Sequence, residues 1–193
     1  MPVLIMLMIV SIEATDTVTV SDINVQDGLA SACKAAAGQI IDAAQANGTP
    51  RIDSANALTE FETSLEENLG LGNGSNGQVM APITNSHFMG TPQTYILVYN
   101  GYNDYAANGG DGCDYYSIAG SSVKPESIAA PTGFPATFYI SNTGVNTSSG
   151  TFEVVLNSPG VIAVIQIQKV QIIGNVPVVV NRWAAARIVW NGS

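Results

Sequence analysis

The sequence predicts an α+β fold with a long N-terminal helix, a short second helix and a C-terminal antiparallel β-rich head. Apolar residues recur at spacings of three and four through residues 1–46, and a second amphipathic run covers residues 53–70. Later apolar runs are short and separated by Gly, Pro and Asn turns, as strands are. Because the helical runs precede the strand-like runs and do not alternate with them, we expect α+β rather than α/β architecture.

The first predicted helix covers residues 1–46, and Asn47-Gly48-Thr49-Pro50 ends it. A helix of this length would measure about 68 Å at 1.5 Å per residue, so much of its surface would need a partner outside the domain. Thr and Val in residues 15–20 are poor helix formers, which leaves a strand there as an alternative. We divide the chain into an assembly helix, residues 1–46, and a globular α+β head, residues 47–193.

The second predicted helix begins after Asp53, a good N-cap residue, and ends at Gly70. Its apolar stripe lies opposite four glutamates, so we expect the helix to pack on a core. The stripe consists of Ala57, Leu58, Phe61, Leu65 and Leu69.

Strand-like runs dominate the rest of the chain. They cover residues 94–99, 136–141, 151–157, 161–173, 176–180 and 183–190. Turn residues at 157–160 and 174–175 predict an antiparallel meander at the C-terminal end.

The composition excludes two classes of protein. The 193 residues include 15 acidic and 6 basic side chains, a net charge of -9, yet charged residues make up only 11%. Disorder requires low hydrophobicity with high charge, and six scattered cations cannot form a basic stripe for nucleic acid. Solubility must come from neutral polar residues, which suits an extracellular or self-assembling protein. Ten of the fifteen acids lie in residues 1–70, so the head is close to neutral.

The two cysteines, Cys33 and Cys113, form no CxxC motif, so a zinc site is unsupported. Two interpretations stay open: two buried free thiols, or one disulfide in an exported protein. Four sequons give candidate glycosylation sites, although chance accounts for several in a chain rich in Asn and Ser. These sites are Asn47, Asn73, Asn146 and Asn191.

Oxygen-bearing side chains gather in the loop around residues 103–114. Asp104, Asp111 and Asp114 are candidate calcium ligands, because calcium takes six to eight oxygens, although the spacing does not match an EF-hand. The alternative is a plain solvated loop, and we expect no other cofactor. The flanking tyrosines predict either a sugar-binding platform or packing around the loop. They are Tyr99, Tyr102, Tyr105, Tyr115 and Tyr116.

We expect no enzyme, because the chain has one histidine and shows no pair of acids or activated nucleophile.

Residues 1–12 are apolar, but as a helix they would span about 18 Å, short of a hydrocarbon core of about 30 Å. They lack the cationic segment and cleavage site of a signal peptide. Glu13 interrupts the apolar run, where an acid either faces solvent or, when buried, pairs with a cation. Because no nearby cation in the sequence can neutralise it, we expect such a partner to come from another chain. The residues expected to serve assembly are Met1, Leu4, Ile5, Met8, Ile9, Ile12 and Glu13.

Residues 1–13, MPVLIMLMIVSIE, and residues 29–37, LASACKAAA, resemble type IV pilin-like proteins, in particular the Tad-type (TadE-like) pseudopilins. The resemblance covers residues 1–46 only, and Ile5 stands where the family places its acid. It implies a helix-core filament in which each subunit's acid, here Glu13, neutralises a neighbour's amine. It also implies a β head facing solvent and transient association with a membrane before assembly.

We therefore expect a structural subunit of an extracellular, cell-surface, pilus-like filament, a homopolymer that binds no nucleic acid. The alternative is a secreted or surface-displayed β-rich glycan-binding module with its site at residues 99–116.

Overall fold

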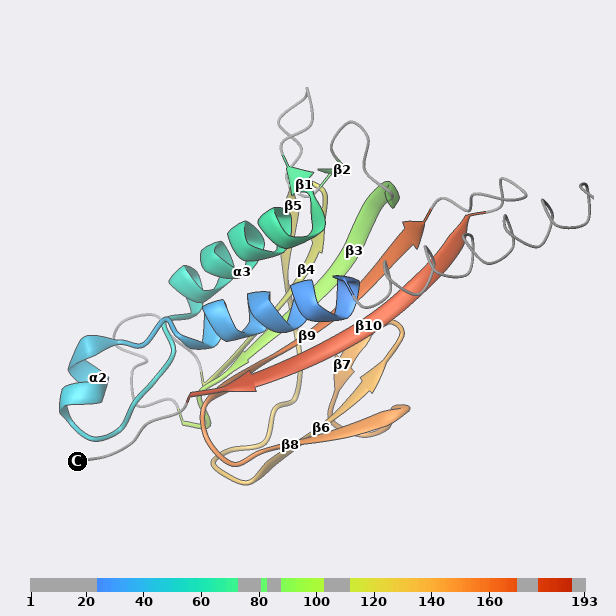
Figure 1. The fold of residues 1–193 in the computed structure, drawn as a ribbon. Helices are drawn as coiled ribbons and strands as arrows, with labels where there is room; N and C mark the ends of the chain where they lie inside the picture. Colours follow the sequence, from blue (N-terminus) through green and yellow to red (C-terminus); the bar gives the residue numbers. More distant parts are fainter. Residues whose placement is uncertain (1–23, 73–80, 83–87, 103–111, 170–176, 189–193) are drawn as a thin grey trace, which may run out of the picture.

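Figure 1 shows the computed structural model, which describes residues 24–72, 81–82, 88–102, 112–169 and 177–188. Within these ranges the helices come first and pack on antiparallel sheets formed by the later part of the chain. The predicted α+β class is therefore confirmed. The segment expected to serve assembly, residues 1–13, lies outside the described residues.

Helices fill the first part of the described chain. The first, an unlabelled blue helix in Figure 1, covers residues 24–37 and is called the 24–37 helix below. It is followed by the short α2 (Asp42–Ala46) and by α3 (Ser54–Leu69). The 24–37 helix and α3 lie side by side over one face of the largest sheet. They approach so closely that a Cβ atom on Gly28 would lie 2.7 Å from Cδ2 of Leu69, and glycine permits this crossing.

The prediction of one continuous helix through residue 46 is wrong at residues 38–41. The helix ends at Gly38, and the chain then extends so that Ile40 forms an antiparallel bridge with Ile52, just before α3. Glycine is a poor helix former, and the β-branched Ile40 and Ile41 favour extended backbone. The bridge brings the chain back alongside the start of α3.

α3 begins and ends where the sequence predicts. Oδ1 of Asp53 accepts hydrogen bonds from the backbone N–H groups of Ala55 and Asn56, each at 3.1 Å, as an N-cap does. Gly70 ends the helix with a left-handed φ of 61°, which glycine adopts at little cost. The predicted stripe is buried except for the half-buried Leu58.

The strands form antiparallel sheets. The five-stranded sheet has the order β10-β9-β3-β4-β5, with β3 (Phe88–Tyr99), β4 (Cys113–Ala119), β5 (Ser122–Glu126), β9 (Gly160–Lys169) and β10 (Val178–Arg187). The three-stranded sheet has the order β7-β6-β8, with β6 (Ala136–Ser141), β7 (Gly144–Asn146) and β8 (Phe152–Leu156). A short pair, β1 (Leu71–Gly72) and β2 (Ala81–Pro82), follows α3.

Most predicted strands are present, but the way in which they pair differs in part from the prediction. β6 covers the predicted residues 136–141, and parts of two predicted runs, 176–180 and 183–190, belong to the single strand β10. The predicted meander is confirmed for β9 and β10, which pair along their length, and is wrong for β8, which pairs with β6 instead. The sequence did not predict β4 and β5, because β4 mixes polar and apolar residues and β5 is exposed throughout.

Both faces of the five-stranded sheet are apolar, and both are covered (Figure 1). In β9, Val161 and Ala163 belong to the core beneath the helices, whereas Ile162 and Val164 belong to the core beneath the three-stranded sheet. Side chains on a strand alternate between faces, so a strand buried on both sides is apolar along its length. The helix-side core includes Val25, Leu29, Ala32, Cys33, Ala36, Phe61 and Leu65.

The 24–37 helix therefore shares its core with the head. The division of the chain at residue 46 stays a prediction, but residues 25–37 contribute to the same buried cluster as α3 and the five-stranded sheet.

Asn100 ties the end of β3 to the segment before α3. It is 6% exposed, its Oδ1 accepts from the N–H of Ile52 at 2.8 Å, and its Nδ2 donates to the carbonyl of Ile52 at 2.9 Å. The amide thus satisfies both backbone groups of Ile52, as a neighbouring strand would.

We predict that Asn100→Ala lowers the free energy of unfolding by about 2–3 kcal/mol, because it leaves the buried backbone groups of Ile52 without partners. Urea unfolding followed by circular dichroism measures the change. Asn68→Ala, at an exposed position of α3, is the control and should change stability by less than about 0.5 kcal/mol. Equal stability of the two variants would contradict the assigned role of Asn100.

Candidate functional site

Among the described groups with shifted pKa values, only Tyr99 and Tyr115 share one core, the core between the sheets, where burial raises the pKa of both. Burial raises the pKa of Cys33 beneath the helices to about 12. Burial, helped by the nearby Cys113 and Tyr102, raises the pKa of Tyr99 between the sheets to about 12. Burial and the neighbouring Glu66 raise the pKa of Glu62 on α3. These shifts have structural causes, and they do not mark one converging set of acid, base and nucleophile.

The calcium prediction concerns a segment that is mostly outside the description. Asp104 and Asp111 fall in residues 103–111, whereas Asp114 lies on β4 and is half-buried. In the part of the chain that is described, no three His, Cys, Asp or Glu side chains gather as a metal site requires. The calcium site stays a prediction.

Of the two interpretations of the cysteines, the structure does not support the disulfide, because Cys33 and Cys113 are not joined to each other. Cys33 lies in the core beneath the helices, where its Sγ contacts the carbonyl oxygen of Ala184 at 3.6 Å. Cys113 begins β4 and packs against the core on the opposite face of the sheet. A disulfide needs Cα atoms within about 7 Å, and here the sheet separates the two side chains.

The tyrosines around residues 99–116 do not form one sugar-binding platform. Tyr99 is buried and its hydroxyl donates to the carbonyl of Pro131 or Gly133, each at 2.7 Å. Tyr115 is also buried, and its hydroxyl accepts from the N–H of Val145 at 3.0 Å. Packing, the second interpretation, accounts for both residues. Tyr116 packs against the helix-side core, Tyr102 is exposed, and Tyr105 lies outside the described residues.

The four candidate glycosylation sites divide evenly between described and undescribed residues. Asn47 is exposed at the end of α2. Asn146 ends β7, and its Oδ1 accepts from the N–H groups of Ser148 and Ser149 at 3.1 and 2.9 Å. Asn73 and Asn191 fall outside the description. Glycosylation stays a prediction at all four positions.

The outer side of the 24–37 helix carries little charge and few bulky side chains. Asp27 and Lys34 are exposed there, one acid and one base, the half-buried Ser31 lies between them, and the half-buried Ala35 follows Lys34. Small side chains let a second helix approach closely, since the distance between packed helices depends on the side chains at the contact.

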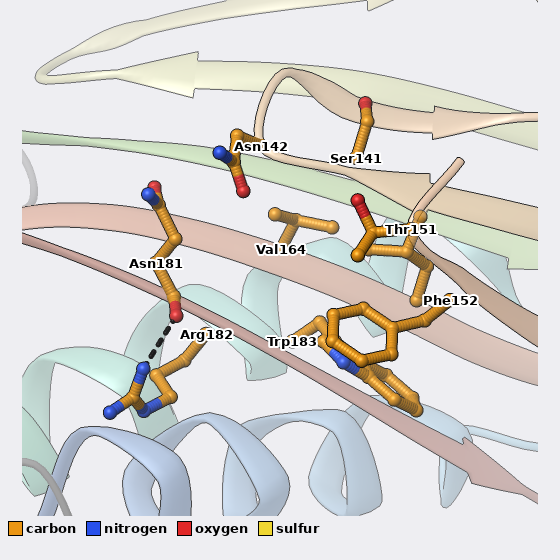
Figure 2. Close-up of a pocket in the computed structure, with 9 residues that line it drawn as sticks. Ser141, Asn142, Thr151, Phe152, Val164, Asn181, Arg182 and Trp183 are labelled. Carbon is orange, nitrogen blue, oxygen red and sulfur yellow. Dashed lines mark hydrogen bonds between the residues drawn. The ribbon is translucent and has the colours of Figure 1, made fainter.

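A small hollow lies where the two main sheets meet at their edges, and sequence reasoning missed it (Figure 2). It encloses about 40 Å³, and its lining includes Phe152 of β8 together with Asn181 and Trp183 of β10. Ligand pockets of drug-sized molecules measure about 300–1,000 Å³, so this hollow cannot enclose a whole ligand. Strand alternation indicates which residues share a face, but the meeting of β8 and β10 depends on the packing of two sheets.

None of the described helices is long and apolar enough to cross a membrane. Comparison of the chain with protein-family models, curated proteins and solved structures finds no match.

The buried Cys33 thiol should make the protein less stable at alkaline pH. Its pKa is about 12 in the folded protein and 9.0 when unperturbed, so between these values the unfolded chain loses a proton that the folded chain keeps. Stability therefore falls as pH rises through this window. We predict that Cys33→Ala reduces the fall in unfolding free energy between about pH 8 and pH 10, measured by urea titration. An unchanged pH dependence would contradict the burial of Cys33.

Proposed function

We propose that this chain is a structural subunit of an extracellular, cell-surface, pilus-like filament that assembles from copies of itself. The observation that carries the proposal is the attachment of the 24–37 helix to the head. Its apolar face, which includes Val25, Leu29 and Ala32, is 0% exposed at these positions. The chain before residue 24 is thus connected to a helix that is fixed on the sheet.

In this proposal, the apolar residues before position 13 are buried against other copies of the chain. The helix-side core is already formed by the 24–37 helix, α3 and the sheet. A strongly apolar segment preceding a helix that is fixed in this way is expected to bury itself against equivalent segments of other copies. The small residues on the outer side of the 24–37 helix favour close approach of a neighbouring helix.

Glu13 supplies the polar contact in this proposal. Lys34 is the only basic side chain in the first 50 residues, so Glu13 has no cation close to it in the sequence. We infer that an amine or Lys34 of a neighbouring copy neutralises the Glu13 carboxylate, since an acid buried between helices requires a partner. The resemblance of residues 1–46 to type IV pilin-like proteins agrees with this role.

The alternative, a glycan-binding module with its site at residues 99–116, has less support. Two of its five tyrosines, Tyr99 and Tyr115, are engaged in the core between the sheets. We also expect no catalytic activity and no nucleic-acid binding, on the composition given above.

Electron microscopy of the negatively stained full chain tests the proposal, beside a variant that lacks residues 1–22. The truncation stops there because Val25 belongs to the core and its removal would damage the head. We predict filaments for the full chain and a folded monomer for the truncated chain. A full chain that stays monomeric at high concentration contradicts the proposal.

The role of Glu13 is tested by Glu13→Gln, which removes the charge and keeps the shape. We expect it to slow assembly or raise the concentration that assembly requires, measured by light scattering. Glu153→Gln is the matched control, because Glu153 is exposed on β8 in the three-stranded sheet, which covers the face of the five-stranded sheet opposite to the helices. Equal assembly of both variants and the parent chain would contradict the charge pairing.

A further inference from the structure

Two edge strands of different sheets meet at the hollow described above. β8 lies at one edge of the three-stranded sheet, and β10 lies at one edge of the five-stranded sheet. Phe152 of β8 and Trp183 of β10 face each other there, with ring centroids 5.7 Å apart and an interplanar angle of 35°. Phe152 is 50% exposed, so half of this large apolar side chain is offered to solvent beside the hollow.

Neutral polar side chains complete the hollow. Figure 2 shows Asn142 and Asn181 on one side of Val164, with Thr151 and the two aromatic rings on the other. Oδ1 of Asn181 is buried, and it has no hydrogen-bond partner among the described residues. An unpaired buried acceptor costs about 1–3 kcal/mol, and because this atom is buried, a ligand can pair with it only when the Asn181 side chain turns toward the hollow.

The hollow itself is uncharged. Side chains alternate along a strand, so Asn181 and Trp183 share one face of β10 and Arg182 lies on the other. Figure 2 shows the Arg182 guanidinium away from Asn142, and its Nη1 donates to the carbonyl of Asn181 at 2.8 Å. The lining contains no acidic side chain. Cleavage of a sugar would need two carboxylates, so the arrangement suits binding and not hydrolysis.

The size of the hollow limits what can enter it. About 40 Å³ admits roughly three water-sized groups. The hydroxyl groups of a sugar are of this size, whereas an aromatic base or amino-acid ring is not. A sugar ring also has an apolar face of C–H groups, which packs against an aromatic surface such as the exposed side of Phe152.

We propose that this hollow is a binding site for a neutral saccharide. One pyranose ring lies against Phe152 beside Trp183, and one or two of its hydroxyl groups enter the hollow. On binding, the Asn181 side chain turns so that its Oδ1 accepts from one hydroxyl, and Asn142 and Thr151 contact the neighbouring hydroxyl groups. The site is separate from residues 99–116, and the 24–37 helix contacts it only from behind β10, where Gln26 Nε2 donates to the carbonyl of Trp183 at 3.1 Å.

Titration of the full chain with neutral tetrasaccharides tests the site. The probes are the tetrasaccharides of cellulose, starch, chitin and mannan, each used up to about 10 mM, which corresponds to weak single-site binding. Binding is measured by calorimetry and by the fluorescence of Trp183 in a Trp190→Phe background, which leaves one tryptophan. We expect at least one probe to bind and to change the Trp183 emission.

Variants then locate the site. We expect Phe152→Ala to weaken binding about tenfold, as loss of one aromatic contact does. Asn181→Leu should weaken binding without lowering stability, since it removes an acceptor that is unpaired in the free protein. Val155→Ala is the matched control, because Val155 is 47% exposed on β8 but points away from the face that carries Phe152.

Three results would overturn the proposal. They are binding of no neutral probe, binding of the acidic sialyllactose alone, and binding that Phe152→Ala and Asn181→Leu leave unchanged. The last result would place any saccharide site elsewhere on the chain.

Discussion

The five-stranded sheet carries apolar side chains on both faces, and the rest of the structure depends on covering them. β9 shows this constraint most clearly, since Val161 and Ile165 require cover on one side and Ile162 and Val164 on the other. The chain meets the requirement with different layers, helices on one face and a second sheet on the opposite face (Figure 1). Exposing either apolar face to water would cost free energy, so the sheet requires both layers.

This constraint limits which part of the N-terminal segment can serve assembly. The 24–37 helix is one of the covering layers, and its Cys33 and Leu29 are buried as fully as the residues of β9. A helix used in this way cannot also present its apolar face to another subunit. Assembly is therefore proposed for the residues before position 24 and for the small residues on the outer side of the 24–37 helix. The proposed saccharide site lies at the β10 edge of the five-stranded sheet. There Phe152 of the three-stranded sheet packs against Trp183 of β10.

Features set by local sequence were predictable, and features set by distant contacts were not. Asp53 and Gly70 marked both ends of α3, because capping depends on a few adjacent residues. The end of the first helix at Gly38 depends partly on the pairing of Ile40 with Ile52. The same holds for the placement of the two cysteines on opposite faces of a sheet and for the aromatic pair between two sheets. Both depend on how the strands assemble. The edge strand β5 is exposed throughout, so its sequence has no apolar pattern that predicts a strand.

Hydrogen exchange of the native protein, followed residue by residue, tests most directly whether the 24–37 helix is part of the head core. We predict that the central amides of this helix exchange as slowly as those of β9, because both become exposed in one cooperative unfolding event. Val161 to Ile165 supply the reference within the same molecule. Amides of residues 29–36 that exchange orders of magnitude faster than β9 would contradict the account, since the helix would then detach while the sheet stays folded.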